Sequence, residues 1–517
     1  MSGVVAALCL VAGACSAPAD SGDRAGVDDA AAGGGIGPAE LAFQQAPVAL
    51  DELRLAMVRP ASFLPTEVAP AEQGAVILAD LLYDGLTEAV GTEGRLRPAL
   101  ARRWWTDADA AGWTFEIDTQ RVSAEAVARH LDGLLRAPPN AGVALLLDGV
   151  RGVEAVGEGE VHFVLDGPNA GLPWLLSGLS LSIVGPDRAT TGRYGVVSED
   201  ETGMILEPVL AGDGPVVATT WTATPRRAYD ELTLTLVDAA VVPPDDLDDA
   251  VGRYGVEVTP RSLTRFYVLN PSSSALADAK VRAAVLAAVD RQRVADEGYG
   301  WPVATIDGVA APTTAGYRAA ICGALCGHDP VRVATLLSAA YGIGELDDNG
   351  PGADGPGPDG AGPAIELRLA VVGDEQVDPA RAVARQLDDV GIEVELLELT
   401  PDELATTIRV GGADIYAFGW AAGAGSVDAV VPHVFGSESP ANGTGVASER
   451  VDELIDRAAA IEDDGARWAV LADAHRQAMA EGLVVPLVAA PSTLVAAPQA
   501  QYLVVRADGS LDISSSR

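Results

Sequence analysis

Few residues in this chain are of the types that carry out covalent chemistry. The five histidines are scattered along the sequence, as His130, His162, His328, His433 and His475. The sequence has no HExxH motif, no GxSxG nucleophile elbow and no glycine-rich loop ending in Lys-Ser or Lys-Thr, so it offers no zinc-protease, serine-hydrolase or phosphate-binding constellation. This pattern favours a binding protein over an enzyme and indicates no cofactor.

Two of the four cysteines lie close together in the segment CGALC, as Cys322 and Cys326. In an exported protein, two neighbouring cysteines with no others nearby most often form a disulfide. A metal site is the alternative, with His328 as a third ligand, but zinc sites generally need more ligands than this. We therefore expect a disulfide and no metal.

The other cysteines, Cys9 and Cys15, belong to the amino-terminal segment. Residues 1–14, MSGVVAALCLVAGA, form a short apolar run. A membrane-spanning helix needs ~20 apolar residues, so this shorter run is typical of a signal peptide. The sequence Ala12-Gly13-Ala14-Cys15 resembles a lipobox, which predicts that Cys15 is acylated after cleavage. A plain secretory signal is the alternative.

The charge of the chain limits its partners. It has 34 Lys and Arg residues against 74 Asp and Glu residues, which gives a formal net charge of −40. Nucleic-acid binding requires a basic surface, and an anionic lipid surface repels an acidic protein, so both are disfavoured. An acidic field can attract cationic ligands, although it also serves simply to keep a protein soluble.

The stretch FGWAAGAGSVDAVV, residues 418–431, offers recognition chemistry instead. Trp420 is followed by small residues, and no charge appears before Asp428. Small residues leave room for a ligand, and an indole ring makes a good aromatic wall. The alternative is a surface loop whose tryptophan fills the core of its own domain.

The elements around this stretch explain how it would be positioned. Strands are predicted at 365–372, 392–399 and 414–418, with helices between them that begin at Pro379, capped by Asp378, and at Pro401, capped by Thr400. This β-α-β-α-β order implies a parallel sheet. Trp420 would then follow the carboxyl end of a strand, where open α/β sheets bind ligands.

From about residue 50 onward the chain carries a collinear series of motifs: LRLAMVRPASFLPTE (53–67), LLYDGLTEAVGTEGRLRPALARRWW (81–105), WTFEIDTQRVSAEAVARHLDGLL (113–135), GDGPV (212–216), FYVLNPSSSALADAKVRAAVLAAVDRQRV (266–294), DPVRVATLLSAAYG (329–342), GIEVELLELTPDEL (391–404), DIYAFGWAAGAG (414–425), VPHVFGSES (431–439) and VDELIDRAAAIEDDGARWAVLADAHRQAMAEGLVVPLV (451–488). Taken in order, these motifs resemble the family 5 extracellular solute-binding proteins, the peptide/nickel/oligosaccharide group that serves ABC importers.

The resemblance implies an α/β fold of the two-lobed, periplasmic-binding-protein-like kind (type II), with an extra small α+β domain on the N-terminal lobe. The two lobes would close on a ligand about a hinge. The expected parts are a signal peptide (1–15), a disordered tether (16–47), lobe I (48–75, 180–262 and 490–517), the small domain (76–179) and lobe II (263–489) with a flexible insertion (342–363).

The resemblance also implies a set of ligand-binding residues in the cleft between the lobes. They are Trp420, Asp428, Tyr83, Asn270, Gly423, Ser426 and Trp301. Similar proteins carry an Asp where Gly423 stands, and commonly a second where Ser426 stands, so a free peptide amine would lack its counter-ion here. The alternatives are an exposed loop carboxylate for Asp428, a tyrosine bonded within its own domain for Tyr83, and backbone contacts for Asn270.

We therefore expect a monomeric lipoprotein, held at the outer face of the cell membrane, that captures a small organic solute, peptide-like or other, and delivers it to an ABC permease. The alternative is a lipoprotein on the same scaffold that transports nothing. Such a protein would regulate or scaffold cell-envelope synthesis through contacts with other proteins.

Overall fold

The computed structural model describes residues 51–513 except 91–94, 108–109, 137–142, 144–145, 211–213, 255–258, 342–364, 422–424, 443–446, 501–502 and 507. The predicted signal peptide with Cys15, the tether, the insertion at 342–363 and Gly423 lie outside the described residues. Within the described part, none of the helices is both long and apolar enough to span a membrane.

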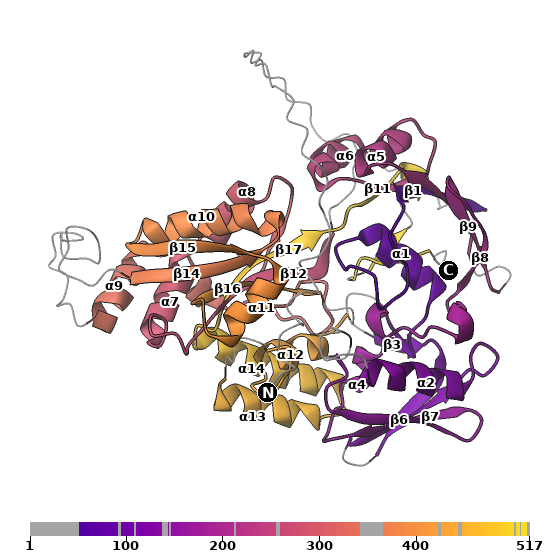
Figure 1. Cartoon of the computed structure of the whole chain (residues 1–517), viewed down its shortest axis with the longest axis horizontal. Coiled ribbons are helices and arrows are strands. Elements are labelled where there is room, and N and C mark those ends of the chain that lie inside the picture. The colour runs from indigo at the N-terminus through magenta and orange to yellow at the C-terminus, as the bar shows by residue number, and fades with distance from the viewer. Residues whose placement is uncertain are drawn as a thin grey trace, which may run out of the picture.

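Lobe I is built on a six-stranded sheet in the order β18-β11-β1-β10-β9-β8 (Figure 1). Its strands are β1 (Glu52–Val58), β8 (Tyr194–Glu199), β9 (Gly203–Pro208), β10 (Val216–Thr222), β11 (Ala239–Val241) and β18 (Leu494–Ala496). The alternation of β1 places Leu53, Leu55 and Met57 in a core shared with helix α1 (Gln73–Leu82). Ala56 on the opposite face packs with helix α5 (Pro225–Thr233), beside α6 (Leu247–Tyr254).

Helix α1 corrects one predicted boundary. The expected border between lobe I and the small domain, at residues 75 and 76, falls inside this helix. Ile77, Leu78 and Leu81 are completely buried in the core of the lobe I sheet. The whole helix therefore belongs to lobe I, because an apolar helix face has to be buried against the sheet that it covers.

The small domain contains a four-stranded antiparallel sheet in the order β4-β5-β7-β6. Its strands are β4 (Ala101–Thr106), β5 (Gly112–Ile117), β6 (Val150–Val156) and β7 (Glu160–Leu165), and helix α2 (Ala124–Leu135) packs on the sheet. A separate hairpin of β2 (Thr87–Val90) and β3 (Arg95–Pro98) precedes it. The short helix α4 (Leu172–Leu175) leads back toward lobe I.

Lobe II contains a second six-stranded sheet, in the order β13-β17-β12-β16-β14-β15. Its strands are β12 (Pro260–Leu269), β13 (Ala304–Thr305), β14 (Ile365–Val372), β15 (Ile392–Leu399), β16 (Ile415–Ala421) and β17 (Val484–Pro491). β14 is parallel to β15 and β16, as predicted, whereas β12 runs antiparallel to β16 and β17. The sheet is therefore mixed.

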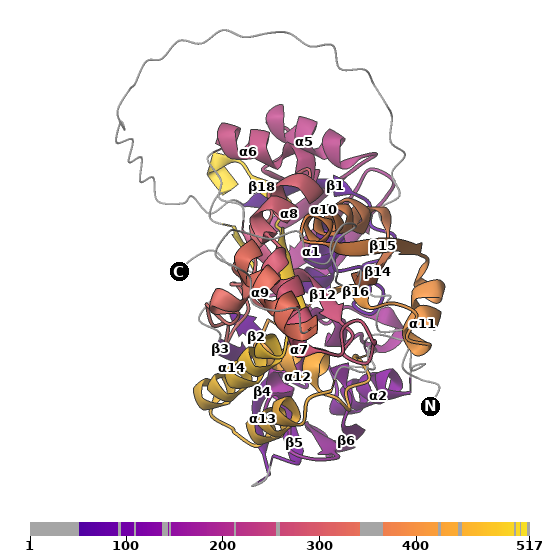
Figure 2. The same cartoon turned by 90° about the vertical axis from the view of Figure 1, so that its left-hand side faces the viewer.

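The helices of lobe II are α7 (Ala279–Ala288), α8 (Arg291–Gly298), α9 (Pro330–Tyr341), α10 (Val377–Asp388), α11 (Pro401–Arg409), α12 (Val431–Phe435), α13 (Glu449–Ala459) and α14 (Asp464–Ala480). In both views, α13 and α14 lie beside the small domain (Figures 1 and 2). The 3₁₀ segments of the chain are η2 (Leu179–Leu181), η3 (Pro186–Arg188), η4 (Pro244–Asp246), η5 (Gly323–Cys326), η6 (Asp374–Gln376), η7 (Val427–Ala429) and η8 (Pro498–Ala500).

Two local predictions have different outcomes. Thr400 caps α11 in a capping box with Glu403, which confirms the sequence signal. The predicted start of the preceding helix is wrong, because α10 begins at Val377 and Asp378 lies in its first turn, 3.1 Å from Arg381. The 3₁₀ turn η6 leads directly into α10, so the helix does not start at the proline.

The two lobes are joined by two crossing segments. One leads from α6 into β12, and the other leads from β17 into β18. The backbone N–H of Ser492 donates to the carbonyl of Thr259 at 2.8 Å, which ties the segments together. A last hairpin, of β19 (Val504–Val505) and β20 (Leu511–Asp512), then packs on lobe I through Leu511.

Candidate ligand-binding site

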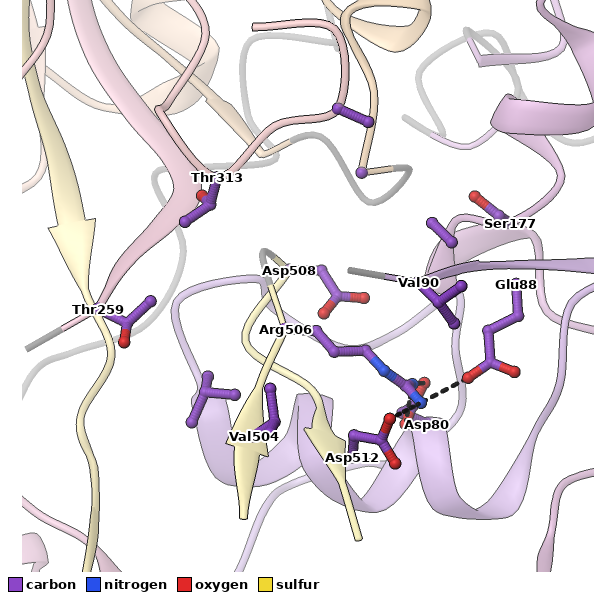
Figure 3. Close-up of a pocket in the computed structure, with 14 residues that line it drawn as sticks. Asp80, Glu88, Val90, Ser177, Thr259, Thr313, Val504, Arg506, Asp508 and Asp512 are labelled. Atoms are coloured by element: carbon purple, nitrogen blue, oxygen red, sulfur yellow. Dashed lines mark hydrogen bonds and ion pairs between the residues drawn. The ribbon is translucent and has the colours of Figure 1, made fainter. Parts of the chain in front are cut away.

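A cavity of about 130 Å³ lies between the two lobes (Figure 3). The N-terminal half of the chain contributes α1, the β2 strand and Ser177, and the last hairpin forms the floor. Lobe II contributes the opposite wall, and Thr259 comes from a crossing segment. The lining residues are Asp80, Glu88, Ala89, Val90, Ser177, Thr259, Thr313, Ala315, Gly425, Val504, Val505, Arg506, Asp508 and Asp512.

Arg506 is the only cation among these lining residues, and it is surrounded by carboxylates. Its Nη1 atom lies 3.2 Å and 3.1 Å from the two carboxylate oxygens of Asp80. Its Nη2 atom donates to Glu88 and lies 3.7 Å from Asp512. Figure 3 shows the guanidinium turned toward these three acids. We call Arg506, Asp80, Glu88 and Asp512 the Arg506 cluster.

Two further arginines support the Arg506 cluster from outside the cavity. Arg97 donates to both carboxylate oxygens of Glu88, at 2.7 Å and 2.8 Å. Arg193 lies 3.6 Å from Asp80. The cluster is thus a network in which each carboxylate has at least one cationic partner, as buried charges require.

The environment of the cluster changes the pKa values of its members. Burial raises the pKa of Asp80 to about 7, against the opposing charges of Arg506 and Arg193. Burial also acts to raise the pKa of Glu88, but Arg506, Arg97 and Arg193 outweigh it and hold that pKa below its ordinary value. The pKa of Arg506 lies above its ordinary value, since the surrounding acids outweigh the effect of burial. Arg506 and Glu88 are therefore charged at neutral pH, whereas Asp80 is partly protonated.

Asp508 is held at the cavity by a tight turn. The N–H of Gly509 donates to the carbonyl of Arg506, and the N–H of Ser510 donates to Oδ1 of Asp508, both at 2.9 Å. The buried guanidinium of Arg261 donates to the carbonyl of Asp508 at 2.8 Å and to that of Pro70 at 2.6 Å. Gly509 has a φ of +92°, and a Cβ atom there would lie 2.3 Å from Nε of Arg261. Only glycine allows this approach.

The wall from lobe II is small and uncharged. The N–H of Ala315 donates to the carbonyl of Gly425 at 2.6 Å, and the N–H of Val427 donates to the carbonyl of Ala315 at 2.9 Å. The hydroxyl of Thr313 donates to the carbonyl of Pro260 at 3.1 Å. All fixed charge on the described cavity lining therefore comes from the N-terminal half and the last hairpin. The lining offers hydrogen-bonding groups and apolar surface, which suits binding.

The structure places Trp420 differently from its prediction. It lies within β16, opposite Thr264, and not after the end of the strand. Its side chain packs against the core of lobe II, with its ring centroid 5.7 Å from that of His433. Its indole Nε1 is buried and has no hydrogen-bond partner among the described residues. Trp420 does not line the interlobe cavity, whereas Gly425, from the same stretch, does.

Ser426 and Asp428 are buried, so Asp428 is not an exposed loop carboxylate. Oδ1 of Asp428 accepts from Nε of Arg467, and its Oδ2 accepts from Nε1 of Trp468, both at 2.7 Å. The hydroxyl of Ser426 accepts from the N–H of Asp428 at 3.2 Å. These contacts use the Asp428 carboxylate within lobe II, although the residue also borders a second cavity between the small domain and lobe II.

Asn270 satisfies backbone groups where β12 ends. Its Oδ1 accepts from the N–H of Ser272 at 3.0 Å, and its Nδ2 donates to the carbonyl of Ala413 at 3.5 Å. β12 pairs Thr264 with Trp420 but Leu269 with Ile415. Asn270 and Trp420 therefore lie near opposite ends of the ladder, about 20 Å apart at ~3.4 Å per residue. One small ligand cannot contact both.

The remaining predicted residues are also apart from the cavity lining. Tyr83, at the end of α1, is buried in the core of lobe I, and burial raises the pKa of its hydroxyl. Trp301 packs on Tyr299, with ring centroids 6.0 Å apart. Neither Tyr83 nor Trp301 lines the cavity, and their binding roles stay predictions.

Sequence reasoning missed the Arg506 cluster. One signal was present, because Asp80 interrupts the otherwise apolar segment GAVILADLL of α1. An acid on an apolar helix requires a partner, but nothing in the sequence indicates that the partner is Arg506, 426 residues away.

Cys322 and Cys326 are joined in a disulfide, with their Cα atoms 5.6 Å apart. The Nδ1 atom of His328 lies 2.9 Å from the carbonyl oxygen of Ala288. Among the residues that the structure describes, no group of three or more His, Cys, Asp or Glu side chains is arranged to hold a metal ion.

Two lobes joined by two crossing segments, with a cavity between them lined from both sides, define the class of two-lobed binding proteins. Residues 232–442 match the model of the "Bacterial extracellular solute-binding proteins, family 5 Middle". This match in the central region confirms the resemblance to family 5 that was seen in the sequence. Family 5 proteins are binding proteins and not enzymes. No protein among those with curated descriptions matches the chain.

Solved structures confirm the fold over most of the chain. HbpA2 from Haemophilus parasuis is 16% identical with a TM-score of 0.72, and the match covers 90% of this chain and 99% of HbpA2. NikA from Brucella suis, in complex with Fe(III)-EDTA, is 19% identical with a TM-score of 0.69, over 90% and 99%. DppA from Helicobacter pylori, in complex with the peptide STSA, is 18% identical with a TM-score of 0.64, over 90% and 96%. These likenesses establish a two-lobed periplasmic binding protein fold.

Proposed function

We propose that this protein is the extracytoplasmic solute-binding component of an ABC importer and that it captures a small organic solute in the interlobe cavity. The observation that carries the proposal is the cavity itself, because residues from both lobes line it. A ligand at such a position contacts both lobes only when they are closed and so stabilises the closed state. The closed form is then what a permease would recognise.

The chemistry of the cavity supports a small solute. Its volume of about 130 Å³ lies below the 300–1,000 Å³ typical of sites for drug-sized ligands. Arg506 is already paired with acids, so it is not available to a ligand carboxylate without breaking the Arg506 cluster. NikA and DppA, which share the fold, hold molecules as different as Fe(III)-EDTA and a peptide, so the fold does not define the ligand.

We further propose that the protein acts as a monomeric lipoprotein, held to the outer face of the cell membrane through Cys15. The supporting features are the short apolar run before Cys15, the lipobox-like sequence and the composition of residues 16–47. Tethering would keep the binder near its permease at a high effective concentration. Mass spectrometry of the protein from membranes would detect the acyl chains on Cys15.

Native mass spectrometry of the purified protein, mixed with metabolites and short peptides, tests solute binding. A Cβ at Gly425 would make only an ordinary 3.7 Å contact with Ala89, so Gly425→Leu should fold normally while its side chain fills the cavity. We expect the wild-type protein to retain a solute and Gly425→Leu to lose it. Gly133→Leu is the matched control, because a Cβ there meets nothing within 4 Å. Failure of the wild-type protein to retain any solute would favour a non-transport role.

A further inference from the structure

The segment around α4 contacts lobe II. It belongs to the N-terminal half of the molecule, by which we mean lobe I together with the small domain. The backbone N–H of Ala170 donates to the carbonyl of Ala459, at the end of α13, at 2.8 Å. Trp174 meets Trp468 of α14 edge to face, with ring centroids 5.1 Å apart and an interplanar angle of 65°. Trp174 is 1% exposed and Trp468 is 6% exposed. The contact between the two halves is therefore dry at its centre.

Trp468 is held in place for this contact. Its Nε1 donates to Oδ2 of Asp428 at 2.7 Å, and the other carboxylate oxygen of Asp428 accepts from Arg467 at 2.7 Å. Asp428 is fixed in turn by the hydroxyl of Ser426, 3.1 Å from its Oδ2. Two hydrogen bonds and an ion pair thus orient the ring that Trp174 contacts.

Gly171 lets the two halves approach closely. A Cβ atom at Gly171 would lie 2.9 Å from Oδ1 and 3.0 Å from Cβ of Asp428. Asp428 is confined by Arg467 and Trp468 and cannot move aside without breaking those contacts. Any larger residue at position 171 would therefore hold α4 away from lobe II.

Acidic side chains of the two halves repel each other next to this contact. A second cavity of about 520 Å³ lies next to it, lined by Asp148 and Asn169 from the small domain and by His433 and Glu438 from lobe II. Asp148 and Glu438 repel each other across this gap. Close contact between the two halves is thus confined to the region around Trp174 and Trp468. The acidic side chains beside this region favour separation of the two halves.

We propose that Gly171 and Trp174 on one side, with Asp428 and Trp468 on the other, form a latch that holds lobe II against the N-terminal half without any ligand. Separating the lobes would expose both indole rings to water, which is unfavourable. Trp174 and Trp468 also belong to one continuous apolar core, whereas the lobe I sheet has separate cores. A solute then enters through a minor population in which the latch is open.

Small-angle X-ray scattering of the full-length, ligand-free protein tests the latch. We expect Gly171→Leu to increase the radius of gyration and to shift tryptophan emission to longer wavelength, because Trp174 and Trp468 become exposed. Gly133→Leu, on α2 of the same domain, should match the wild type in both measurements, since a Cβ there meets nothing within 4 Å.

A second variant guards against a folding defect in the first. Trp174→Phe keeps an apolar ring in the core of the N-terminal half but shortens its reach to Trp468, so we expect a smaller increase in the radius of gyration. Emission is not compared for this variant, because it lacks one of the emitting indoles. If both variants keep the radius of gyration of the wild type, there is no latch. No solute enters either measurement, so this result is independent of whether the proposed transport function holds.

Discussion

Asp428 and Arg467 form an ion pair inside lobe II, with 2.7 Å between Oδ1 and Nε and side chains that are only 5% and 1% exposed. The pair joins the loop after β16 to α14. The sequence predicted Asp428 as a ligand contact, whereas the structure uses its carboxylate to orient Arg467 and Trp468.

Asp428→Asn should therefore destabilise the protein. The substitution leaves the buried Arg467 with only the half-exposed Asp464 as an ionic partner, and breaking a buried ion pair typically costs about 3 kcal/mol or more. Urea unfolding followed by circular dichroism measures this loss. Asp473→Asn breaks the exposed pair with Arg476 and should change stability little. If Asp428→Asn abolishes solute binding at unchanged stability, Asp428 is a ligand contact after all.

Arg506→Met should destabilise the protein more than Arg506→Lys. The methionine leaves Asp80 and Glu88 without their shared cation, at a cost of about 3 kcal/mol or more. Lysine keeps the charge but loses the forked geometry that serves two acids at once. Urea unfolding of both variants measures the order. Arg103→Met, at an ion pair on the surface, is the control.

Asp80 should lower the stability of the protein as the pH rises from about 5 to 7. Burial raises the pKa of Asp80 from 3.8 to about 7, so in this interval the folded protein keeps a proton that the unfolded chain releases. The free energy of unfolding then falls with rising pH, by up to ~1.4 kcal/mol per pH unit.

The Asp80→Asn variant isolates this effect. It lacks the titrating group, so the wild-type protein should lose stability relative to the variant between pH 5 and pH 7 in parallel urea titrations. A constant difference over that range would mean that the pKa of Asp80 is close to its ordinary value.

Replacement of both Cys322 and Cys326 by serine should lower the free energy of unfolding only modestly. The bond closes a loop of five residues, for which the loss of chain entropy amounts to about 2 kcal/mol. The melting temperature of the double variant, compared with that of the oxidised wild type, measures the effect. A loss of the folded state would show that the bond has a larger role than closing this loop.

The sequence predicted those features whose signals are local. The Thr400–Glu403 capping box needs only residues three positions apart, and the parallel strands β14, β15 and β16 follow from apolar runs separated by helices. Collinear family motifs extended these local signals to the two-lobed fold.

The candidate site could not be predicted in the same way. Asp80 and Arg506 are brought together only because the last hairpin returns to α1, and no pattern around either residue specifies that return. The predicted strand ended at residue 418, which placed Trp420 after it. β16 instead continues through Gly419 to Ala421, so Trp420 lies within the strand. Asn270 was assigned to the same cleft as Trp420, although β-ladder register places them at opposite ends.

The origin of the cavity floor has a consequence for the order of events in the cell. The floor includes Val504, Arg506 and Asp512, whereas the first charged wall residue is Asp80. A chain that emerges from the ribosome or crosses the membrane from its amino end therefore has only Arg193 beside Asp80 and Arg97 beside Glu88 until Arg506 arrives. Completion of the proposed binding site is thus one of the last steps of maturation, and a polypeptide cut short before residue 504 would lack the floor of this cavity.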